Sequence, residues 1–392
     1  MELTLQRNAP VASASALLPI MGAVFVSFLI VGLAMPVLPL HVHHGLGLST
    51  VVVGLVAGSQ FAASIVSRAW AGRHADSRGA KHAVVMGLLL AAAGGVLYLL
   101  SLRFTGQPVL SAALLFAGRA FLGAGESFAI TGAQTWGFLL AGARNTGKVI
   151  AWMGTALYAA FALGAPLGTV LYARYGFAPI AFATALVPLA SLALVAPLPR
   201  VVPTAGAGAS FQKILRAVWL PGLGLALTSA GFGAMTAFAS LLFSARGYAV
   251  WPAFTAFAVA LILARTFLGS AADRMGGARV ALAFLFVEAA GLAILWFATS
   301  FVMGVGGAAL AGFGYSLVYP GFGVEAVRRA PAGSHGLAMG VYGGFLDVAL
   351  ALGSPALGFI AGISDIGTVF LVAAISAACA APIAIRLMKG PR

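Results

Sequence analysis

The sequence predicts an all-α membrane protein whose twelve transmembrane helices form two pseudo-symmetric six-helix bundles. Three observations lead to this fold class: the apolar composition, twelve apolar runs of spanning length, and a charged pattern that occurs twice. Of the 392 residues, 61% are hydrophobic and only 8% are charged, and the mean hydropathy is +1.05. A soluble domain of this length does not have such a composition, so we expect the chain to lie in a lipid bilayer.

Twelve apolar runs follow one another along the chain, and each is long enough to cross the hydrocarbon core as a helix. Only helices or closed barrels span lipid, because every backbone polar group must be paired within the protein. The runs lack the alternation of barrel strands and are about twice too long for them. A count of ten or eleven spans would need re-entrant segments. The runs cover residues 16–40, 49–71, 82–102, 109–139, 148–173, 178–198, 214–243, 250–271, 280–299, 302–327, 336–362 and 366–387.

Basic residues predict the orientation of these spans. With an even number of spans, both termini lie on one side of the membrane. If that side is the cytoplasm, sixteen of the 22 Lys and Arg residues lie in cytoplasmic segments or at the cytoplasmic ends of spans, three lie in outside loops, and three lie deeper within spans. This bias follows the positive-inside rule. It accounts for the net charge of +14 by contact with anionic lipid headgroups, so we expect no nucleic-acid partner.

Several other site classes are not expected. The first run is too long for a cleavable leader, and the single Cys379 cannot form a disulfide within the chain. His41, His43 and His44 lie together in a predicted outside loop, but no Cys or carboxylate accompanies them. We therefore expect a solvated loop and no metal site. No glycine-rich run follows a strand, which argues against a nucleotide site.

A charged pattern appears twice and indicates an internal duplication. "SRAWAGRHADSRGAK" follows the second run and "ARTFLGSAADRMGGAR" follows the eighth, at an offset of 197 residues. "GAGES" and "GFGYS" are a second, weaker pair of similar segments at an offset of 189. The equivalent pairs in the charged pattern are Arg68 and Arg265, Gly72 and Gly269, and Asp76 and Asp273.

The duplication predicts the domain organisation. We expect an N-terminal six-helix bundle over residues 1–198, a Pro-, Gly- and Ala-rich cytoplasmic linker over 199–212, and a C-terminal six-helix bundle over 213–392. Two homologous membrane halves usually place a solute site between them near the midplane of the bilayer.

The repeated pattern resembles the loop signature of the major facilitator superfamily. His74, Ser77 and Ala80 depart from that signature. "GLAMPVLP" (32–39), "RAFLG" (119–123) and "FALGAPLG" (161–168) are similar to further motifs of its drug–proton antiporters, although one glycine of the last is absent. The signature residues present are Gly72, Ala75, Asp76, Gly79 and Lys81 in the first copy and Gly269, Ala272, Asp273, Arg274 and Gly276 in the second.

A narrower resemblance is carried by "GESFAITGAQTWG", "TSAGFG" and "FGYSLVYPGFGVEAV". These stretches look like the YhhS-type, sugar-efflux-like subgroup of bacterial inner-membrane transporters. The resemblance implies a major facilitator fold in a bacterial inner membrane, with both termini in the cytoplasm.

The resemblance also assigns a gate to the repeated pattern. In the family, the acidic residue after the second spanning helix caps the dipole of the eleventh spanning helix, here 336–362, and pairs with basic neighbours, which closes the inner side. The alternative is a solvated loop charge. The predicted gate residues are Gly72, Asp76, Arg78, Lys81, Gly269, Asp273 and Arg274.

Three further charges lie at membrane depth: Arg119, Glu126 and Asp347. Arg119 and Glu126 are seven residues apart, so they share a helix face. Asp347 lies about 16 Å along its helix from Gly336. Charges near the bilayer centre cost at least about 2.5–3.5 kcal/mol each, so a functional reason is expected.

The duplication shows that the fold does not require these charges. At an offset of 189, Arg119 falls on Ala308, Glu126 on Tyr315, and Asp347 on Tyr158. We therefore predict that Asp347 or Glu126 carries a coupling proton, and that Arg119 is the positive group that controls its release. The alternative is a static buried ion pair.

Polar and aromatic side chains at compatible depth predict the solute cavity, although packing alone could explain each of them. Glu325 is expected to pair locally with Arg328 and Arg329, and Arg265 is one candidate partner for Glu288. The predicted cavity residues are Gln60, Gln134, Trp136, Trp152, Tyr158, Phe232, Thr236, Tyr315, Tyr319 and Tyr342.

Together these features predict a proton-coupled secondary transporter that exports a small sugar-like or drug-like solute by alternating access. An uptake symporter or uniporter is the first alternative, and a lipid scramblase or an intramembrane enzyme is the second. No nucleophile–base pair or HExxH pattern supports an enzyme. We expect no cofactor, the proton gradient as energy source, lipids and protons as partners beside the solute, and a monomer.

Overall fold

The computed structural model describes residues 14–141, 146–198, 210–269, 271–331 and 335–389. In this part of the chain every regular element is a helix, and twelve helical segments are long and apolar enough to cross a membrane. These segments coincide with the twelve predicted runs within a few residues at most ends, so the predicted fold class is confirmed. The linker 199–209 lies outside the described residues.

The helices follow the chain in order, and three of the twelve spans continue through a short second or third element. The elements are α1 (Ala14–Ala34), α2 (Val37–Leu40), the π-helix η1 (His41–Gly45), α3 (Thr50–Arg78), α4 (Ala80–Ser101), the 3₁₀-helix η2 (Leu102–Phe104), α5 (Pro108–Ala141), α6 (Thr146–Tyr175), α7 (Ala178–Val195), α8 (Phe211–Ala245), α9 (Trp251–Leu268), α10 (Ala271–Met275), α11 (Gly277–Phe297), α12 (Phe301–Arg329), α13 (His335–Ile363), α14 (Ile366–Ala378) and α15 (Ala381–Met388).

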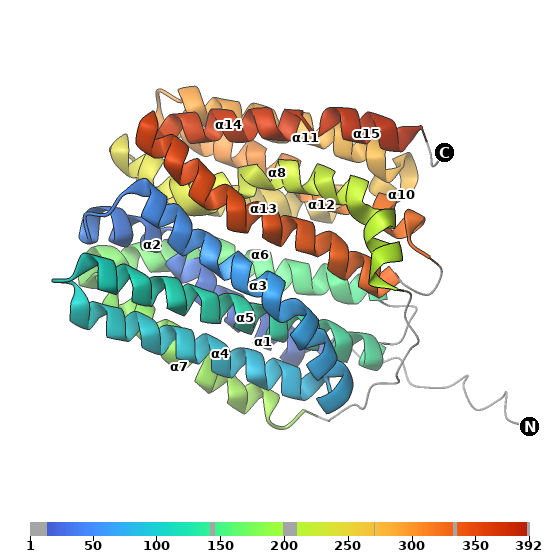
Figure 1. Cartoon of the computed structure of the whole chain (residues 1–392), viewed down its shortest axis with the longest axis horizontal. Helices are drawn as coiled ribbons and strands as arrows, with labels where there is room; N and C mark the ends of the chain where they lie inside the picture. The colour runs from blue at the N-terminus through green and yellow to red at the C-terminus, as the bar shows by residue number, and fades with distance from the viewer. Residues whose placement is uncertain (1–13, 142–145, 199–209, 270, 332–334, 390–392) are drawn as a thin grey trace, which may run out of the picture.

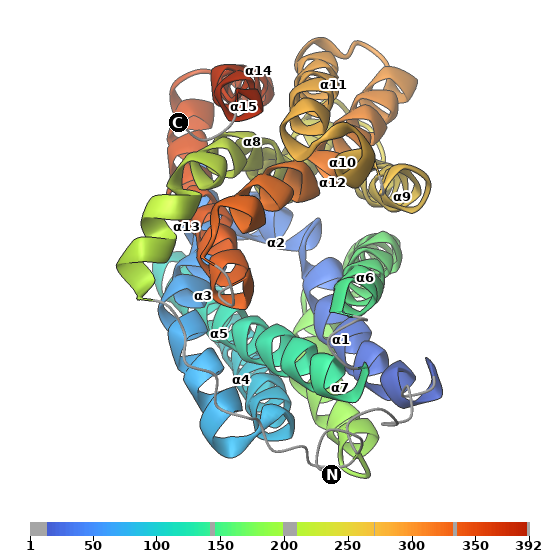
Figure 2. The ribbon, with the colours of Figure 1, turned by 90° about the vertical axis from the view of Figure 1, so that its right-hand side faces the viewer.

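The helices form two groups, α1–α7 and α8–α15, which we call the N-bundle and the C-bundle (Figure 1). Figure 2, viewed along the helices, shows the two groups one above the other, with α3 beside α13 where they meet. We call the end at which α15 finishes the terminal face, and the end that carries the turn between η1 and α3 the opposite face. Helices α3 and α9 run toward the terminal face, whereas α6 and α13 run away from it.

The duplication is visible in the helix contacts. Glycine lets neighbouring backbones touch, as is usual in membrane helices. A Cβ placed on Gly94 of α4 would lie 3.4 Å from the backbone nitrogen of Leu122 in α5, and one on Gly291 of α11 would lie 2.3 Å from that of Ala311 in α12. The glycines are 197 residues apart and their partners 189, which are the two offsets found in the sequence.

The turns after α3 and α10 explain one glycine in each copy of the charged pattern. Gly79 has φ +95° and Gly276 has φ +93°, in the region that favours glycine over other residues. The two residues are again 197 apart. A side chain at either position would strain the turn that starts the next spanning helix.

The bundles touch closely near the opposite face. A Cβ on Gly54 of α3 would lie 2.2 Å from the carbonyl oxygen of Ser354 in α13, and the Thr50 hydroxyl donates to the carbonyl oxygen of Gly358 at 2.8 Å. Toward the terminal face, a Cβ on Gly72 of α3 or on Gly344 of α13 would meet no atom within 4 Å. The backbones of α3 and α13 therefore approach closely near the opposite face, and no such close approach occurs at Gly72 or Gly344.

Candidate functional site

An ion pair joins the two bundles at membrane depth. Nε of Arg68, on α3, donates to Oδ2 of Asp347, on α13, at 3.0 Å, and its Nη2 donates to the same oxygen. The Asp347 side chain is 5% exposed and that of Arg68 is 31% exposed. The sequence predicts Arg119 as the positive group that controls proton release, and in the structure the arginine in contact with Asp347 is Arg68, which reaches across from the other bundle.

Glu126 lies in the same cluster. Nε2 of Gln60 donates to Glu126 Oε2 at 2.6 Å, while Oε1 has no hydrogen-bond partner among the described residues. Helices α3 and α5 can bring these side chains together because Gly123 has no Cβ, which would lie 1.8 Å from the Gln60 carbonyl oxygen. Arg68 and Asp347 are within electrostatic range of Glu126. The two carboxyl groups from opposite bundles therefore belong to one polar cluster.

A second arginine crosses between the bundles. The guanidinium of Arg265, on α9, lies over the ring of Tyr158, on α6, with its central carbon 5.1 Å from the ring centroid. Its Nη2 donates to the Ser316 carbonyl oxygen at 3.3 Å. The hydroxyl of Tyr319, on α12, is within electrostatic range of both crossing arginines, Arg68 and Arg265.

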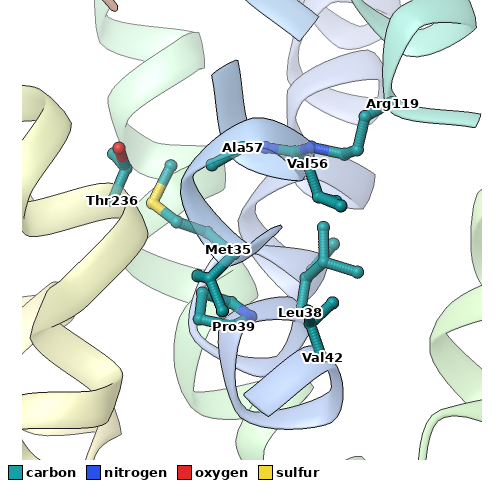
Figure 3. Close-up of a pocket in the computed structure, with 10 residues that line it drawn as sticks. Met35, Leu38, Pro39, Val42, Val56, Ala57, Arg119 and Thr236 are labelled. Carbon is teal, nitrogen blue, oxygen red and sulfur yellow. The ribbon is translucent and has the colours of Figure 1, made fainter. Parts of the chain in front are cut away.

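Arg119 occupies a separate, mostly apolar pocket. Figure 3 shows its side chain extending toward Val56 and Ala57, beside Met35 and the end of the first span. The cavity there is about 10 Å³, at the lower limit for holding one water molecule. Nε and Nη1 of Arg119 have no hydrogen-bond partner among the described residues. Arg119 lies within electrostatic range of Glu126 but does not form an ion pair with it.

Glu288, on α11, is a buried acid of the C-bundle. The residue is 1% exposed, and neither carboxyl oxygen has a hydrogen-bond partner within the described part of the chain. A Cβ on Gly231 of α8 would lie 2.5 Å from Oε1, so this glycine makes room for the carboxyl group. Arg265 does not reach Glu288, because it extends to Tyr158 and Ser316 instead.

The other predicted cavity residues divide into two sets. Trp136 and Tyr342 are wholly buried in this structure, and the Tyr342 hydroxyl donates to the Tyr319 carbonyl oxygen at 2.7 Å, so both contribute to packing here. Phe232 stacks on Tyr315 with ring centroids 5.4 Å apart. Partly exposed positions are Gln134 on α5, Trp152 on α6, and Thr236 on α8, which lines the Arg119 pocket.

The predicted gate residues are only partly placed. The side chains of Asp76 and Asp273 lie outside the described part of the chain. Lys81 Nζ donates to the carbonyl oxygens of Ala196 and Leu198 at 2.6 and 2.8 Å, beyond the C-terminus of α7, where a cation is favourable. The remaining predicted gate positions lie near the end of α3 (Gly72, Arg78), after α9 (Gly269) and in α10 (Arg274).

Two minor sequence expectations have clear outcomes. Glu325 pairs with Arg328 at 3.3 Å and with Arg329 at 2.5 Å, as predicted. His41 stacks on Phe177 with ring centroids 4.5 Å apart, so it packs instead of lying in a solvated loop. Among the described residues, no cluster of His, Cys, Asp and Glu could hold a metal ion.

Arg68 is the site residue that sequence reasoning did not select. The sequence carried a signal for it, because Arg68, Arg119 and Arg265 are the three basic residues that lie more than two residues inside the predicted spans. An intramembrane cation is a functional candidate by default. From the sequence, Arg68 is recognised only as part of the repeated pattern and Arg265 as a possible partner of Glu288, so the position of both at the contact between the bundles is missed.

A membrane protein of twelve helices in two repeated bundles, with ionised side chains where the bundles meet, has the architecture of a secondary transporter. A family model described as Major Facilitator Superfamily matches residues 20–252 and 243–392. The chain belongs to the major facilitator superfamily, and it is a multi-pass membrane transporter, not an enzyme.

Relatives and solved structures agree with this assignment. An uncharacterized MFS-type transporter of Salmonella typhimurium (strain LT2), STM4428, is 40% identical over 375 residues, covering 94% of this chain and 96% of the relative. The uncharacterized MFS-type transporter YhhS of Escherichia coli (strain K12) is 39% identical over 368 residues, covering 94% and 91%.

Two solved structures share the fold. The nucleoside transporter NupG matches with a TM-score of 0.71 at 16% identity, covering 96% of this chain and 100% of that one. The human organic anion transporter MFSD10 matches with a TM-score of 0.69 at 14% identity, covering 94% and 98%. At these identities the likeness is one of fold.

Proposed function

We propose that this chain is a proton-coupled secondary active transporter that exports a small organic solute by alternating access across a bacterial inner membrane. The observation that carries the proposal is the cluster of Gln60, Glu126, Arg68 and Asp347 at the contact between the bundles. Charged groups at membrane depth are costly and are retained for function. The counterparts of Glu126 and Asp347 in the other repeat are Tyr315 and Tyr158, so the fold itself does not need acids there.

The cluster suits coupling because its ion pair spans two parts that must move. In alternating access, one bundle rocks against the other about the central site. Such rocking would separate the α3 and α13 segments that hold Arg68 and Asp347. A proton could then replace the guanidinium as the partner of the carboxylate. Glu126 lies within electrostatic range of both groups and could receive or pass on the same proton.

The terminal face is proposed to be cytoplasmic. Arg73, Arg78, Arg328 and Arg329 belong to the segments at this face, in keeping with the positive-inside rule. The bundles are in close contact near the opposite face, where Gly54 meets Ser354. With this orientation we propose an inward-facing state for the structure.

Export is the preferred direction because α6 carries the antiporter-like motif. A Cβ on Gly164 would lie 2.7 Å from the Gly32 carbonyl carbon, and one on Gly168 would lie 2.1 Å from the Leu33 carbonyl oxygen. The motif therefore holds α6 tightly against α1 inside the N-bundle. The absence of one motif glycine favours the alternative of uptake by symport, which the sign of the proton movement would distinguish.

Substrate-dependent proton movement in proteoliposomes tests the function. The purified protein is reconstituted around a pH-sensitive dye and exposed to sugars, amino acids and cationic drugs. Opposed movement of protons and solute would establish antiport, and parallel movement would establish symport. Solute flux with no effect of the pH gradient would contradict proton coupling.

Variants that remove the charge of one carboxyl group then test whether the cluster carries the proton. Pairs of measurements compare pH-driven flux with solute exchange at equal pH for Glu126→Gln and Asp347→Asn. Loss of the true carrier should reduce driven flux at least about tenfold, a barrier change of about 1.4 kcal/mol, while exchange persists. Asp365→Asn, an acid at the opposite face that bonds to Thr368, is the matched control. If both cluster variants keep full driven flux, the proton moves elsewhere.

A further inference from the structure

The two crossing arginines are equivalent by the internal repeat. Arg68 and Arg265 are 197 residues apart, and the residues they reach, Asp347 and Tyr158, are 189 apart. These are the offsets at which helix contacts recur in the two bundles. Each arginine leaves its own bundle and meets the other one, Arg68 on α13 and Arg265 on α6. The molecule therefore contains two versions of a single contact.

The two versions differ in one chemical respect. Arg68 has a carboxylate partner, whereas Arg265 has an aromatic ring where the repeat would place that carboxylate. No described acid lies within ion-pair distance of Arg265. Among the described residues, its hydrogen bond to the Ser316 carbonyl oxygen uses one of the five N–H donors of a guanidinium. A ring contact uses the face of the guanidinium and leaves the donor edge free.

The surroundings of Arg265 are partly open and offer polar and aromatic neighbours. Arg265 is partly exposed. A Cβ on Gly154, one turn before Tyr158 on α6, would meet only Nη1 of Arg265 within 4 Å. The hydroxyl of Tyr319 is within electrostatic range of the guanidinium and is a further hydrogen-bonding group. A polar and aromatic rim thus surrounds a cation that no described carboxylate neutralises.

We propose that Arg265 binds a carboxylate group of the transported solute, which takes the place that Asp347 occupies beside Arg68. This inference rests on the proposed transport function and narrows its substrate class to small organic anions. The fork of a guanidinium matches a carboxylate with two parallel hydrogen bonds, which lysine does not reproduce. Tyr158 holds the guanidinium in place from beneath, and solute binding bridges α6 and α9, as the ion pair bridges α3 and α13.

The first experiment compares solutes that differ in charge alone. Charge movement and counterflow are recorded on reconstituted protein with three pairs: gluconate and gluconamide, galacturonate and galacturonamide, and nicotinate and nicotinamide. At least one acid should be transported about tenfold better than its amide. Equal transport of an acid and its amide, or of amides alone, would overturn the inference and leave the transport function standing.

A lack of response to all three pairs would also overturn the inference for small carboxylates. The transport function would then be decided separately by the screen of sugars, amino acids and cationic drugs. The two failures are therefore distinguishable.

The second experiment supplies the missing carboxylate within the chain. Tyr158→Asp would give Arg265 an internal partner that competes with the solute, whereas Tyr158→Asn has the same shape without the charge. Both variants lose the ring, so their ratio isolates the charge. Acid transport by the Asp variant should fall at least about tenfold below that of the Asn variant. Equal transport by the two would show that the solute carboxylate binds elsewhere.

Arg265 variants keep the test decisive if the Tyr158 variants do not fold. Arg265→Gln should lose the preference for acids over amides, and Arg265→Lys should retain only part of it. An unchanged preference in Arg265→Gln would overturn the assignment.

Discussion

The two bundles have equivalent backbone contacts but different chemistry at their centres. In the N-bundle, Gly123 brings α5 against Gln60, and in the C-bundle Gly312 brings α12 against Phe257 in the same way. The N-bundle pair then presents an amide and the Glu126 carboxyl group, which are hydrogen-bonded to each other. The C-bundle presents aromatic rings, since Phe257 packs near Phe232, which stacks on Tyr315.

At a second pair of equivalent contacts, the carboxyl group lies in the C-bundle instead of the N-bundle. A Cβ on Gly125 would lie 3.0 Å from the backbone nitrogen of Ala91, and one on Gly314 would lie 2.2 Å from that of Glu288. Here the N-bundle has a methyl group and the C-bundle has a buried carboxyl group. Glycine-mediated contacts fix the fold in both halves, and the side chains beside them are free to diverge. Differences between equivalent positions therefore indicate function more sharply than shared residues do.

The largest expected effect follows from breaking the contact at Arg68. Arg68→Gln leaves Asp347 buried without its counter-charge, so transport should be lost and stability should fall by about 2 kcal/mol. Thermal unfolding in nanodiscs and flux in liposomes measure the two effects. Arg73→Gln, an exposed arginine of the same helix, is the control and should change neither.

A double variant sharpens the Arg68 prediction. Arg68→Gln combined with Asp347→Asn removes both charges, so the stability lost in the single variant should largely return while coupling stays lost. A double variant as unstable as Arg68→Gln alone would show that the two side chains are not energetically coupled.

An effect of intermediate size is expected from adding a methyl group near one end of α3 but not near the other. A Cβ on Gly54 would lie 2.2 Å from the Ser354 carbonyl oxygen, whereas one on Gly72 would meet nothing within 4 Å. Gly54→Ala should therefore destabilise this state by about 1–3 kcal/mol, and Gly72→Ala should not. The reporter is the labelling rate of Gly344→Cys, with the native Cys379 replaced by alanine. Equal labelling in both variants would contradict the difference in backbone packing between Gly54 and Gly72.

The smallest effect concerns helix caps, which also differ between the bundles. Asp365 caps α14 by accepting from the Thr368 backbone N–H at 3.1 Å, and Ser300 caps α12 by accepting from that of Met303 at 3.3 Å. Ser49, in the N-bundle, precedes α3 without a side-chain cap. Asp365→Ala and Ser300→Ala should each cost about 1 kcal/mol at neutral pH, while Ser49→Ala should cost less.

Low pH should distinguish the stabilisation given by the Asp365 cap from that given by the Ser300 cap. The hydrogen bond from the Thr368 side chain is the main cause that holds the pKa of Asp365 below its usual value. Its stabilisation is therefore present above the unfolded-state pKa and is lost as the pH falls through the folded-state pKa. The cost of Asp365→Ala, measured by thermal unfolding, should vanish at acid pH, whereas that of Ser300→Ala should persist. A cost of Asp365→Ala that does not depend on pH would contradict this account.

Sequence reasoning predicted the spans, the duplication and the family because these depend on composition and spacing. It also predicted that Glu126 and Asp347 lie at membrane depth, since depth follows from helix rise. It could not predict which way each side chain faces its neighbours. The partner of Asp347 is Arg68, 279 residues away, and that pairing depends on the rotation of α3 against α13. For the same reason Trp136 and Tyr342 were predicted to line a cavity, and in this structure they pack in the core.

The central claim is that protons bind at the cluster where the bundles meet, and not at the acid buried inside the C-bundle. Infrared difference spectroscopy on reconstituted protein reports it directly, because a pH step changes the carbonyl band of any carboxyl group that gains or loses a proton. The account predicts that the titrating band is lost in Asp347→Asn or Glu126→Gln and remains in Glu288→Gln. A band that remains in both cluster variants and disappears in Glu288→Gln would contradict the account.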